Sequence, residues 1–529
     1  MLSVLAVSLV LVLVVAVALS SGPGEPPPAT GAAEVVPADA LIYLHFSTDP
    51  TRPGVKRALA LARRLPGFPL LTAALATRLG AILGGSSGAA VDFGTQVRPW
   101  LGKEAAFALL NTSTSTAGSL IVLDVRNRRR ASAFLTGAGA GEDGSYHGAA
   151  LLHQGSGTVL AFVRHYLVFG QDASVRAAID VAAGRAGSLA SSPAYEHAAA
   201  GEPAGRVLDA YASVAGVRRV LAPRGGLLGA LGVLLNQPAL TAATISVSAV
   251  FGGARVRVHS AIDPIVARLS GPAPSPFTPT LTDLMPAGAS VLLDVRGLGR
   301  VAPRVLAAAA AGGLGRGVGP LLGRLGSALR SEGVDIERIL SIFSGETAVA
   351  LSPATSGSAG HGPALVIVTR THQAATREAL AALELPLAQL FPPPSAGAGQ
   401  AAVFSDVQVA GVTAHRLSLA PGLQLDYAVF HKLVVLATSL QAIAAVARHS
   451  HPLAGEPAYE ATLGHRPDQV TSLLFLDFSQ LLHLGEQTGL TGSARLAALR
   501  PDLRKIRAIG LASTRGEADT TAELFLQIP

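Results

Sequence analysis

Four glutamates stand at matching places in the two halves of the sequence, where they could do acid–base chemistry. Glu104 and Glu346 share a similar local sequence, and Glu196 and Glu460 each end a repeated word, Pro-Ala-Tyr-Glu. A carboxylate pair serves as acid and base when an apolar site raises the pKa of one member. The plainer interpretation is a solvated turn entering a strand for the first two, and a helix start for the other two. Nothing in the sequence shows that either pair meets.

Two histidines allow a proton-sensing interpretation, because histidine titrates near neutral pH. His165 and His431 each lie at a strand start beside a predicted tight turn, where a capping or solvent-facing histidine is the alternative. His449 and His451, with Glu456 nearby, could hold a metal ion, but no third and fourth ligands are apparent. We therefore assign no catalytic, metal-binding or cofactor-binding residue. The candidates that remain are the four glutamates, His165 and His431.

Two glycine-rich stretches have the spacing of known sites but the wrong surroundings. Gly84-Gly85-Ser86-Ser87-Gly88 fits a nucleophile elbow, which needs a strand before it and a helix after it. Here a predicted helix comes before it. Residues 313–319 alternate glycines as phosphate loops do, but they follow an alanine-rich helical stretch and lack the Gly-Lys-Ser/Thr ending. Both stretches favour simple loops or helix breaks.

The composition excludes several classes of protein. Cysteine is absent, which excludes disulfides, thiolate metal sites and cysteine nucleophiles. Only 5% of the residues are aromatic, which argues against stacking platforms for single-stranded nucleic acid. The formal net charge is +7, but the arginines are scattered along the sequence, so we predict no nucleic-acid partner. A hydrophobic share of 49% indicates a folded chain.

The N-terminus predicts attachment to a membrane. Leu2–Leu19 carries no charge and just reaches the roughly 20 residues that cross a bilayer. Ser20–Pro28 is rich in glycine and proline and predicts an extended tether. A signal peptide cleaved after Ala18 is the alternative. We predict residues 1–20 as a transmembrane anchor or signal peptide and residues 21–35 as a linker. The protein is then single-pass in the cytoplasmic membrane, with most of the chain extracytoplasmic.

Matching stretches occur in the same order in both halves, which indicates an internal duplication. The pairs are Val36–Leu44 with Met285–Leu293, Leu101–Leu109 with Ser344–Leu351, Ser119–Leu123 with Ala364–Val368, His165–Phe169 with His431–Val435, the two Pro-Ala-Tyr-Glu words, and Ala243–Val250 with Ile506–Ser513. We predict two homologous tandem modules, residues 36–264 and 284–529, joined by a linker over residues 265–283 that contains a proline-rich stretch.

The mixed periodicity within a module predicts an α+β fold. In the first module we expect strands at 40–46, 105–110, 119–125, 149–153, 159–164, 166–170 and 208–212, a hairpin of 244–251 and 254–262 turning at Gly252-Gly253, and helices at 55–64, 70–83, 131–135 and 174–183. Strands follow one another with few helices between them. Each module should therefore be a largely antiparallel sheet with helices packed on one face, after an N-terminal transmembrane helix.

Several of these features together resemble a bacterial family, domain of unknown function 3352. They are the Pro37-Ala38-Asp39-Ala40 opening before a strand, the Trp-Leu-Gly-x-Glu-Ala step at residues 100–105, the His-x-Leu-Val strand, and the later Pro-x-Tyr helix start. The resemblance covers most of the chain after the anchor. It implies a single N-terminal transmembrane helix and a large extracytoplasmic region, and it implies no activity.

We therefore expect a membrane-anchored extracytoplasmic binding or scaffold protein of the bacterial cell envelope, rather than an enzyme. One alternative is a hydrolase that uses paired carboxylates in a cleft between the modules. Another is a carrier of lipid or a different apolar ligand, and an envelope protein is a further expected partner. The arginine- and leucine-containing stretches 55–83 and 300–330 could rest on anionic lipid or pack on the sheet with their arginines at its rim.

Overall fold

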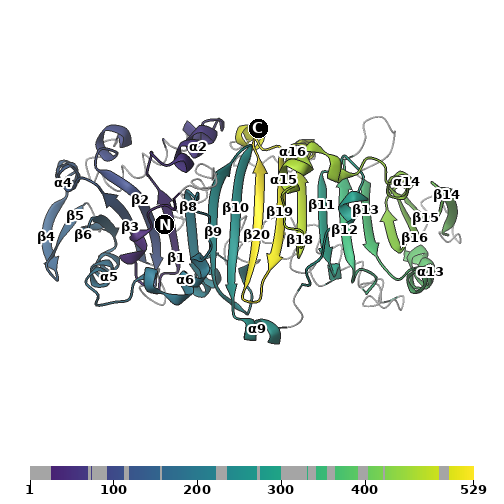
Figure 1. The fold of residues 1–529 in the computed structure, drawn as a ribbon, viewed down its shortest axis with the longest axis horizontal. Coiled ribbons are helices and arrows are strands. Elements are labelled where there is room, and N and C mark those ends of the chain that lie inside the picture. The colour runs from purple at the N-terminus through teal and green to yellow at the C-terminus, as the bar shows by residue number, and fades with distance from the viewer. Residues whose placement is uncertain are drawn as a thin grey trace.

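One antiparallel sheet of 20 strands dominates the structure (Figure 1). The computed structural model describes residues 26–69, 73, 92–111, 118–154, 158–221, 235–270, 274–299, 331, 341–353, 364–390, 403–420, 423–487 and 500–529. We call residues 26–270 the first half and residues 274–529 the second half. The fold is α+β with a large antiparallel sheet, as the succession of predicted strands indicated.

The first half contributes ten strands to the sheet. They are β1 (Ile42–Ser47), β2 (Leu101–Leu110), β3 (Gly118–Val125), β4 (Gly141–Tyr146), β5 (Ala149–Gln154), β6 (Thr158–Val163), β7 (Tyr166–Gly170), β8 (Leu208–Ser213), β9 (Leu240–Val250) and β10 (Gly253–Ile262). Their order across the sheet is β4-β5-β6-β7-β3-β2-β1-β8-β9-β10, and every neighbouring pair is antiparallel.

The second half contributes the other ten. They are β11 (Val291–Arg296), β12 (Glu346–Ser352), β13 (Ala364–Arg370), β14 (Ser405–Val409), β15 (Val412–Ala420), β16 (Leu423–Phe430), β17 (Leu433–Ala437), β18 (Ser472–Asp477), β19 (Ala508–Arg515) and β20 (Asp519–Gln527). Their order, β14-β15-β16-β17-β13-β12-β11-β18-β19-β20, repeats that of the first half strand for strand.

The two halves meet where β10 pairs with β20, so that one sheet runs through the whole molecule (Figure 1). Arg257 lies directly opposite Glu523 in this pairing, with Nε 4.0 Å from Oε1. Antiparallel pairing of strands that hold the same place in each half gives the junction an approximate twofold axis perpendicular to the sheet.

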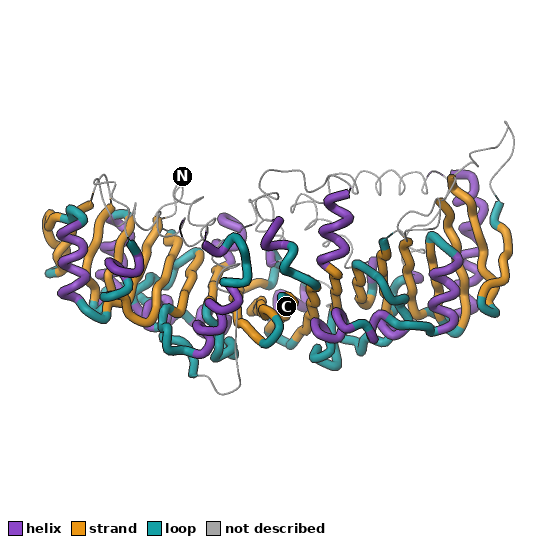
Figure 2. Tube along the Cα trace, turned by 90° about the horizontal axis from the view of Figure 1, so that it is seen from above, coloured by secondary structure: helices purple, strands orange, loops and turns teal. Residues whose placement is uncertain are grey.

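Helices cover both faces of the sheet, so the prediction of helices on one face is wrong (Figure 2). One face, which we call the α5 face, carries α5 (Asp172–Ala182) and α6 (Pro193–Ala199), whose side chains share a cluster with Tyr43 of β1. The opposite α4 face carries α2 (Pro53–Ala62) and α4 (Arg128–Gly137). The reason is that β1 and β3 are apolar on both sides, and successive strand residues point to opposite faces.

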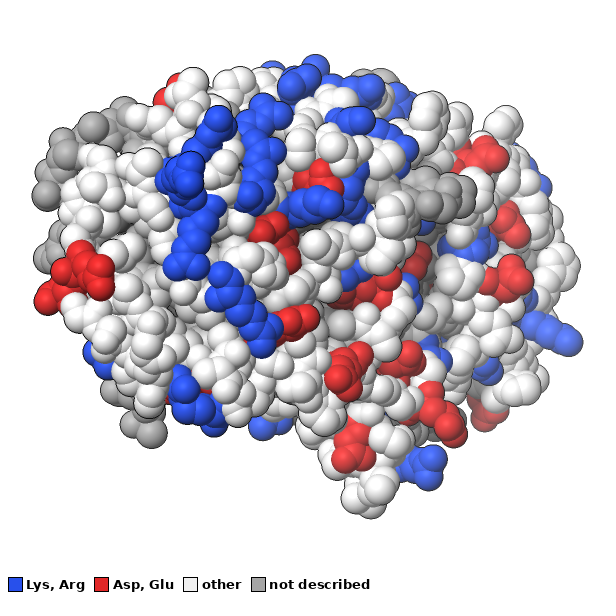
Figure 3. Space-filling view, turned by 60° about the vertical axis from the view of Figure 1, so that its left-hand side comes forward, with Lys and Arg blue, Asp and Glu red and all other residues white. Residues whose placement is uncertain are grey.

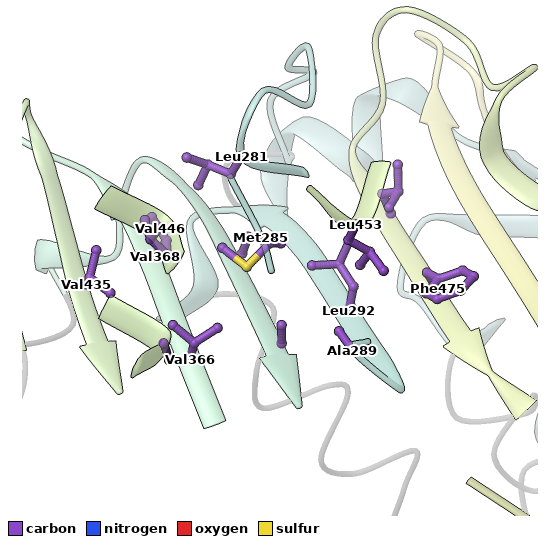
Figure 4. Close-up of a cluster of buried hydrophobic side chains, with 14 of the residues drawn as sticks. Leu281, Met285, Ala289, Leu292, Val366, Val368, Val435, Val446, Leu453 and Phe475 are labelled. Atoms are coloured by element: carbon purple, nitrogen blue, oxygen red, sulfur yellow. The ribbon is translucent and has the colours of Figure 1, made fainter. Parts of the chain in front are cut away.

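The second half has a similar core on the face equivalent to the α5 face (Figure 4). α14 (Leu440–Arg448) and α15 (Pro457–Leu463) pack there on β11, β13, β17 and β18. Met285, Leu292, Val446 and Phe475 are among the side chains that meet in this cluster. Two further helices of this half, α13 (Gln373–Leu390) and α16 (Phe478–Gln487), flank the sheet.

The packed body extends beyond the predicted module limits. Gly31–Glu34 forms a one-turn helix, η1, and Ala32 and Ala33 are buried in the first core, although residues 21–35 were predicted as a linker. The second half has an equivalent turn, η6 (Leu281–Asp283), in the region predicted as the linker 265–283. Leu281 and Phe277 belong to the second core. Both segments carry apolar residues that the sheet buries, so they are parts of the fold.

The predicted elements of the first half match β1 to β3, β5 to β10, α2, α4 and α5 to within a few residues. The arginine-rich run Arg126–Arg130 leads into α4, which Asn127 caps by accepting a hydrogen bond from the N–H of Arg130. The hairpin turns at Phe251-Gly252, because Gly253 already pairs with Val250.

Several predicted features lie outside the described residues: the span Leu2–Leu19, the helix predicted at 70–83 apart from residue 73, and the glycine-rich stretches at 84–88 and 313–319. Within the described part of the chain, no helix combines the length and apolar character that a membrane crossing requires.

Candidate functional site

The repeated word Pro-Ala-Tyr-Glu starts a helix in both halves, as predicted. Proline is the first residue of α6 and of α15, where its missing N–H removes no helical hydrogen bond. Ser192 immediately precedes α6, but its hydroxyl accepts no hydrogen bond from the helix. Glu196 and Glu460 are exposed. The word is therefore a structural signal, and its glutamates face solvent.

Glu104, in contrast, is buried, which corrects its prediction as a solvated turn residue. It lies in β2 on the α5 face, and its Oε2 accepts a hydrogen bond from the N–H of Ala32 in η1 at 3.2 Å. The hydroxyl of Tyr166 donates to Oε1 at 2.7 Å. His45 Nε2 of β1 lies 3.3 Å from Oε2 as an ion pair. Glu104 therefore fastens η1 to the sheet and is part of a buried charged cluster.

The buried cluster continues along the next strand. His45 Nδ1 is 2.9 Å from Asp209 Oδ1 of β8, and Arg206 Nε donates to the same oxygen at 2.9 Å. Glu202 lies 2.9 Å from Arg206 Nε. We call His45, Glu104, Glu202, Arg206 and Asp209 the histidine cluster. Both ring nitrogens of His45 face carboxylates and the side chain is fully buried, so no ring nitrogen is available to a substrate.

Burial and neighbouring charges set the protonation of the histidine cluster. Burial alone would lower the pKa of His45, but Asp209 and then Glu104 raise it to about 9. Burial alone would raise the pKa of Asp209 and of Glu104, but the cationic neighbours hold both below their ordinary values. Burial, followed by the charge of Asp209, raises the pKa of Glu202 to about 8. His45 and Arg206 are thus the cations of the cluster, Asp209 and Glu104 stay ionised beside them, and Glu202 is the carboxyl group that keeps its proton to the highest pH.

Glu346 repeats the fastening role of Glu104 in the second half. Its carboxylate accepts from the N–H of Thr280 and, at 2.8 Å, from the N–H of Leu281 at the start of η6. The Thr280 hydroxyl and Arg370 Nε donate to Oε2 at 2.6 and 3.0 Å. Four donors on a nearly buried carboxylate make a strong structural tie.

The place of His45 is taken in the second half by Asp294. His45 lies opposite Ala106 in β2 and Asp294 opposite Ala348 in β12, each two residues beyond the buried glutamate. On the other side, His45 faces Asp209 but Asp294 faces Leu473. Asp294 is fully buried, and neither of its carboxylate oxygens has a hydrogen-bond partner among the described residues. Burial, and then the charge of Glu346, raise its pKa to about 8.

Glu346→Ala should lower the free energy of unfolding by about 2–4 kcal/mol, because four donors at a buried position lose their acceptor. Glu460→Ala is the matched control, since Glu460 is exposed and duplicated in the same way. Urea-induced unfolding followed by circular dichroism compares the two. Equal unfolding midpoints for both variants would contradict the structural tie.

The structure does not bring the candidate glutamates together. Between β2, which carries Glu104, and β12, which carries Glu346, lie β1, β8, β9, β10, β20, β19, β18 and β11. At about 4.8 Å per strand this separation is roughly 40 Å. With Glu196 and Glu460 exposed, these four carboxylates form no common acid–base site, and the paired-carboxylate hydrolase has no centre among them.

The candidate histidines lie at the surface. His165 and His431 are exposed turn residues, at the second position of the β6–β7 turn and the first position of the β16–β17 turn, so they are not equivalent. His165 Nε2 is 4.0 Å from Asp124 Oδ1. His449 and His451 are exposed, and Glu456 accepts from the N–H of Gly288 instead. The described residues contain no group of three or more His, Cys, Asp or Glu side chains arranged for a metal ion.

Sequence reasoning missed the residues that matter most here: His45, Asp209, Arg206 and Asp294. One signal was available, because His45 and Asp294 each interrupt an otherwise apolar strand, Ile42–Ser47 and Val291–Arg296. A charged residue inside such a run is rarely left buried without a partner or a shifted pKa. The partners themselves come from distant strands, and the local pattern does not name them.

These features define an α+β protein built on one long antiparallel sheet, with buried charged clusters that fasten short helices to it. The chain belongs to a family described as "Protein of unknown function (DUF3352)", whose model matches residues 1–528. No curated protein matches the chain.

Three crystal forms of TP0453 are similar to parts of the chain, each at a TM-score of 0.25. Form I is 13% identical and covers 49% of this chain and 90% of that one. Form III is 12% identical and covers 44% and 80%, and form IV is 14% identical and covers 46% and 87%. At these TM-scores the similarity supports no statement about function.

Proposed function

We propose that the protein is a membrane-anchored, extracytoplasmic scaffold or binding protein of the cell envelope, without enzymatic activity. The observation that carries this proposal is the uncharged run Leu2–Leu19, long enough to cross a bilayer, placed only a few residues before the folded body. The body is already fixed at Pro26, whose carbonyl accepts a hydrogen bond from Arg52 Nη2 at 3.2 Å.

We also propose that the body consists of two homologous modules that arose by duplication. The identical strand order supports this, as do the buried glutamates Glu104 and Glu346, which each fasten a one-turn helix, and the prolines that start α6 and α15. Antiparallel pairing of β10 with β20 then joins two equivalent edges, as a symmetric dimer interface would. The product is a long, continuous platform suited to scaffolding.

The absence of cysteine makes a direct test of the topology possible. Leu269→Cys places a single thiol on an exposed residue of α9 (Pro264–Leu269). A membrane-impermeant maleimide should label this variant in intact cells, and the protein should resist extraction by alkaline carbonate. Labelling only after lysis would refute the extracytoplasmic location. Release by carbonate, or a mature chain that starts after Ala18, would refute the anchor.

A further inference from the structure

An exposed basic surface lies on the α4 side of the first half, around one end of the strands, and includes one residue of the second half that packs beside it. We call it the basic face and define it by six exposed residues: Lys56, Arg63, Arg64, Arg129, Arg130 and Lys505. Figure 3 shows Lys and Arg side chains gathered over the upper part of this end of the molecule, with most Asp and Glu below and to the side. The residues come from three distant parts of the chain.

Backbone and side-chain hydrogen bonds join these three parts into one surface. The Thr48 N–H, just before α2, donates to the Lys103 carbonyl, and the Lys103 N–H donates to Asp124 at the end of the strand that leads into α4. After α2 in the sequence, the Gly67 N–H donates to Asp502 Oδ1 at 2.7 Å. This last bond holds the segment that carries Lys505 beside α2.

The basic residues differ from the arginines of the α5 face in their partners. On the α5 face, Arg164, Arg176 and Arg185 each form an ion pair, with Glu34, Asp172 and Asp180 respectively. None of the six residues of the basic face forms an ion pair with a described residue. The nearby Asp49 and Asp92 accept hydrogen bonds within their own loops. The six cations of the basic face therefore have no direct ion-pair partner among the described side chains.

Apolar side chains project from the same region. Leu59 of α2 is 41% exposed, and Phe251 at the β9–β10 turn is fully exposed. The strands on either side of that turn pack with α2, since Ala249 and Ala254 share a cluster with Ala58 and Leu61. Basic residues that surround exposed leucine and phenylalanine are the combination that binds anionic lipid surfaces.

The tether enters the body beside the basic face. Arg52, which donates to the Pro26 carbonyl, immediately precedes α2. If the membrane span ends at Leu19, the chain between Leu19 and Pro26 reaches at most roughly 25 Å when extended. The body must then stay close to the membrane, with α2 near the point of attachment.

We propose that the basic face rests on the anionic lipid surface of the membrane in which the chain is anchored, with Phe251 at the level of the headgroups. This inference rests on the proposed anchor. It assigns α2 and the Lys505 segment to the membrane side of the molecule and leaves the α5 face and the rest of the second half available to other partners.

The test uses the full chain reconstituted into vesicles. The variant Phe251→Cys is labelled with an environment-sensitive fluorophore. If the basic face is docked, lipids that carry a quencher near the headgroup should quench the fluorescence of this label. Leu269→Cys is the matched control, because α9 follows the opposite end of β10, about 30 Å away. We expect quenching at position 251 in vesicles that contain phosphatidylglycerol. We expect little quenching at position 251 in vesicles of phosphatidylcholine alone, and little in 1 M salt, where the Debye length falls to about 3 Å. We expect no quenching at position 269 under any of these conditions.

Removing charge from the basic face should release it. Lys56→Gln/Arg63→Gln/Arg64→Gln is expected to lower the docked-to-undocked ratio roughly a hundredfold. Arg268→Gln/Lys432→Gln/Arg448→Gln removes the same charge from exposed residues elsewhere and should change little.

The outcomes separate the two proposals. A chain that does not float with vesicles refutes the anchor. A chain that floats but shows equal quenching with both lipids, no quenching at position 251, or equal loss in both triple variants refutes the docking while the anchor stands.

Discussion

Asp209→Ala should lower the free energy of unfolding by about 3–5 kcal/mol, because it removes the shared partner of two buried cations. Asp209 accepts from Arg206 Nε and contacts His45 Nδ1, both at 2.9 Å, and it is nearly inaccessible to solvent. His45 can release its proton when it loses this partner, but arginine cannot. The uncompensated charge of Arg206 is therefore the main source of the loss.

Glu202 should moderate this loss. Its pKa is raised by burial and by Asp209, so without Asp209 it can ionise and pair with Arg206. We therefore expect Glu202→Gln/Asp209→Ala to be less stable than Asp209→Ala. Glu202→Gln alone should be nearly neutral at pH 7. Glu34→Ala, which breaks the exposed pair with Arg164, is the control and should have a much smaller effect than Asp209→Ala.

The pH dependence gives a second readout of the same variant. The pKa of His45 rises from 6.5 to about 9 on folding, so its contribution is complete below pH 6.5 and is lost as the pH rises through 9. Asp209→Ala should flatten the stability profile in this window.

Trp100, the only tryptophan, is buried in the first half and reports unfolding by its fluorescence. An Asp209→Ala variant with unchanged midpoint and unchanged pH profile would show that the histidine cluster does not stabilise the fold.

Much of the fold follows from local sequence patterns. Apolar runs such as Ser119–Val125 and Tyr166–Gly170 predict strands because a strand buried on both sides needs apolar residues at consecutive positions. The one strand of the first half that was missed, β4, has the sequence Gly-Glu-Asp-Gly-Ser-Tyr and lies almost wholly exposed at the edge of the sheet. Its hydrogen bonds to β5 hold it in place, and its own residues carry no strand pattern.

The candidate site could be predicted only in part, because its partners are far apart in the sequence. Glu104 and Glu346 were found through their matching surroundings, but their burial was not. Each fastens a one-turn helix that comes before the first strand of its half, and this contact depends on the strand order. His45 and Asp209 are 164 residues apart and meet only because β1 pairs with β8. Local periodicity carries no information about such pairings.

Asp294→Asn should raise the free energy of unfolding at pH 7 by about 2–4 kcal/mol, which is an unusual direction for a substitution in a core. Asp294 is fully buried without a hydrogen-bond partner among the described residues. Burial and Glu346 raise its pKa from 3.8 to about 8, and the charges of Arg466 and Arg370 do not offset this. Keeping a proton on such a carboxyl at pH 7 costs about 4 kcal/mol relative to the unfolded chain, and asparagine avoids most of this cost.

The pH profile distinguishes this explanation from a simple packing effect. A carboxyl with a raised pKa binds its proton more tightly in the folded state, so its contribution is complete below about pH 4. That contribution is lost as the pH rises from 4 to 8. Asp294→Asn should flatten this slope of the free energy of unfolding against pH. The pH dependence that comes from Glu202 and His45 should remain. Asp468→Asn, at an exposed position, should leave the profile unchanged. Urea titrations between pH 4 and 9, followed by circular dichroism, measure both effects. A stabilisation of Asp294→Asn that is the same at pH 4 and pH 8 would mean that packing, and not the buried proton, is the cause.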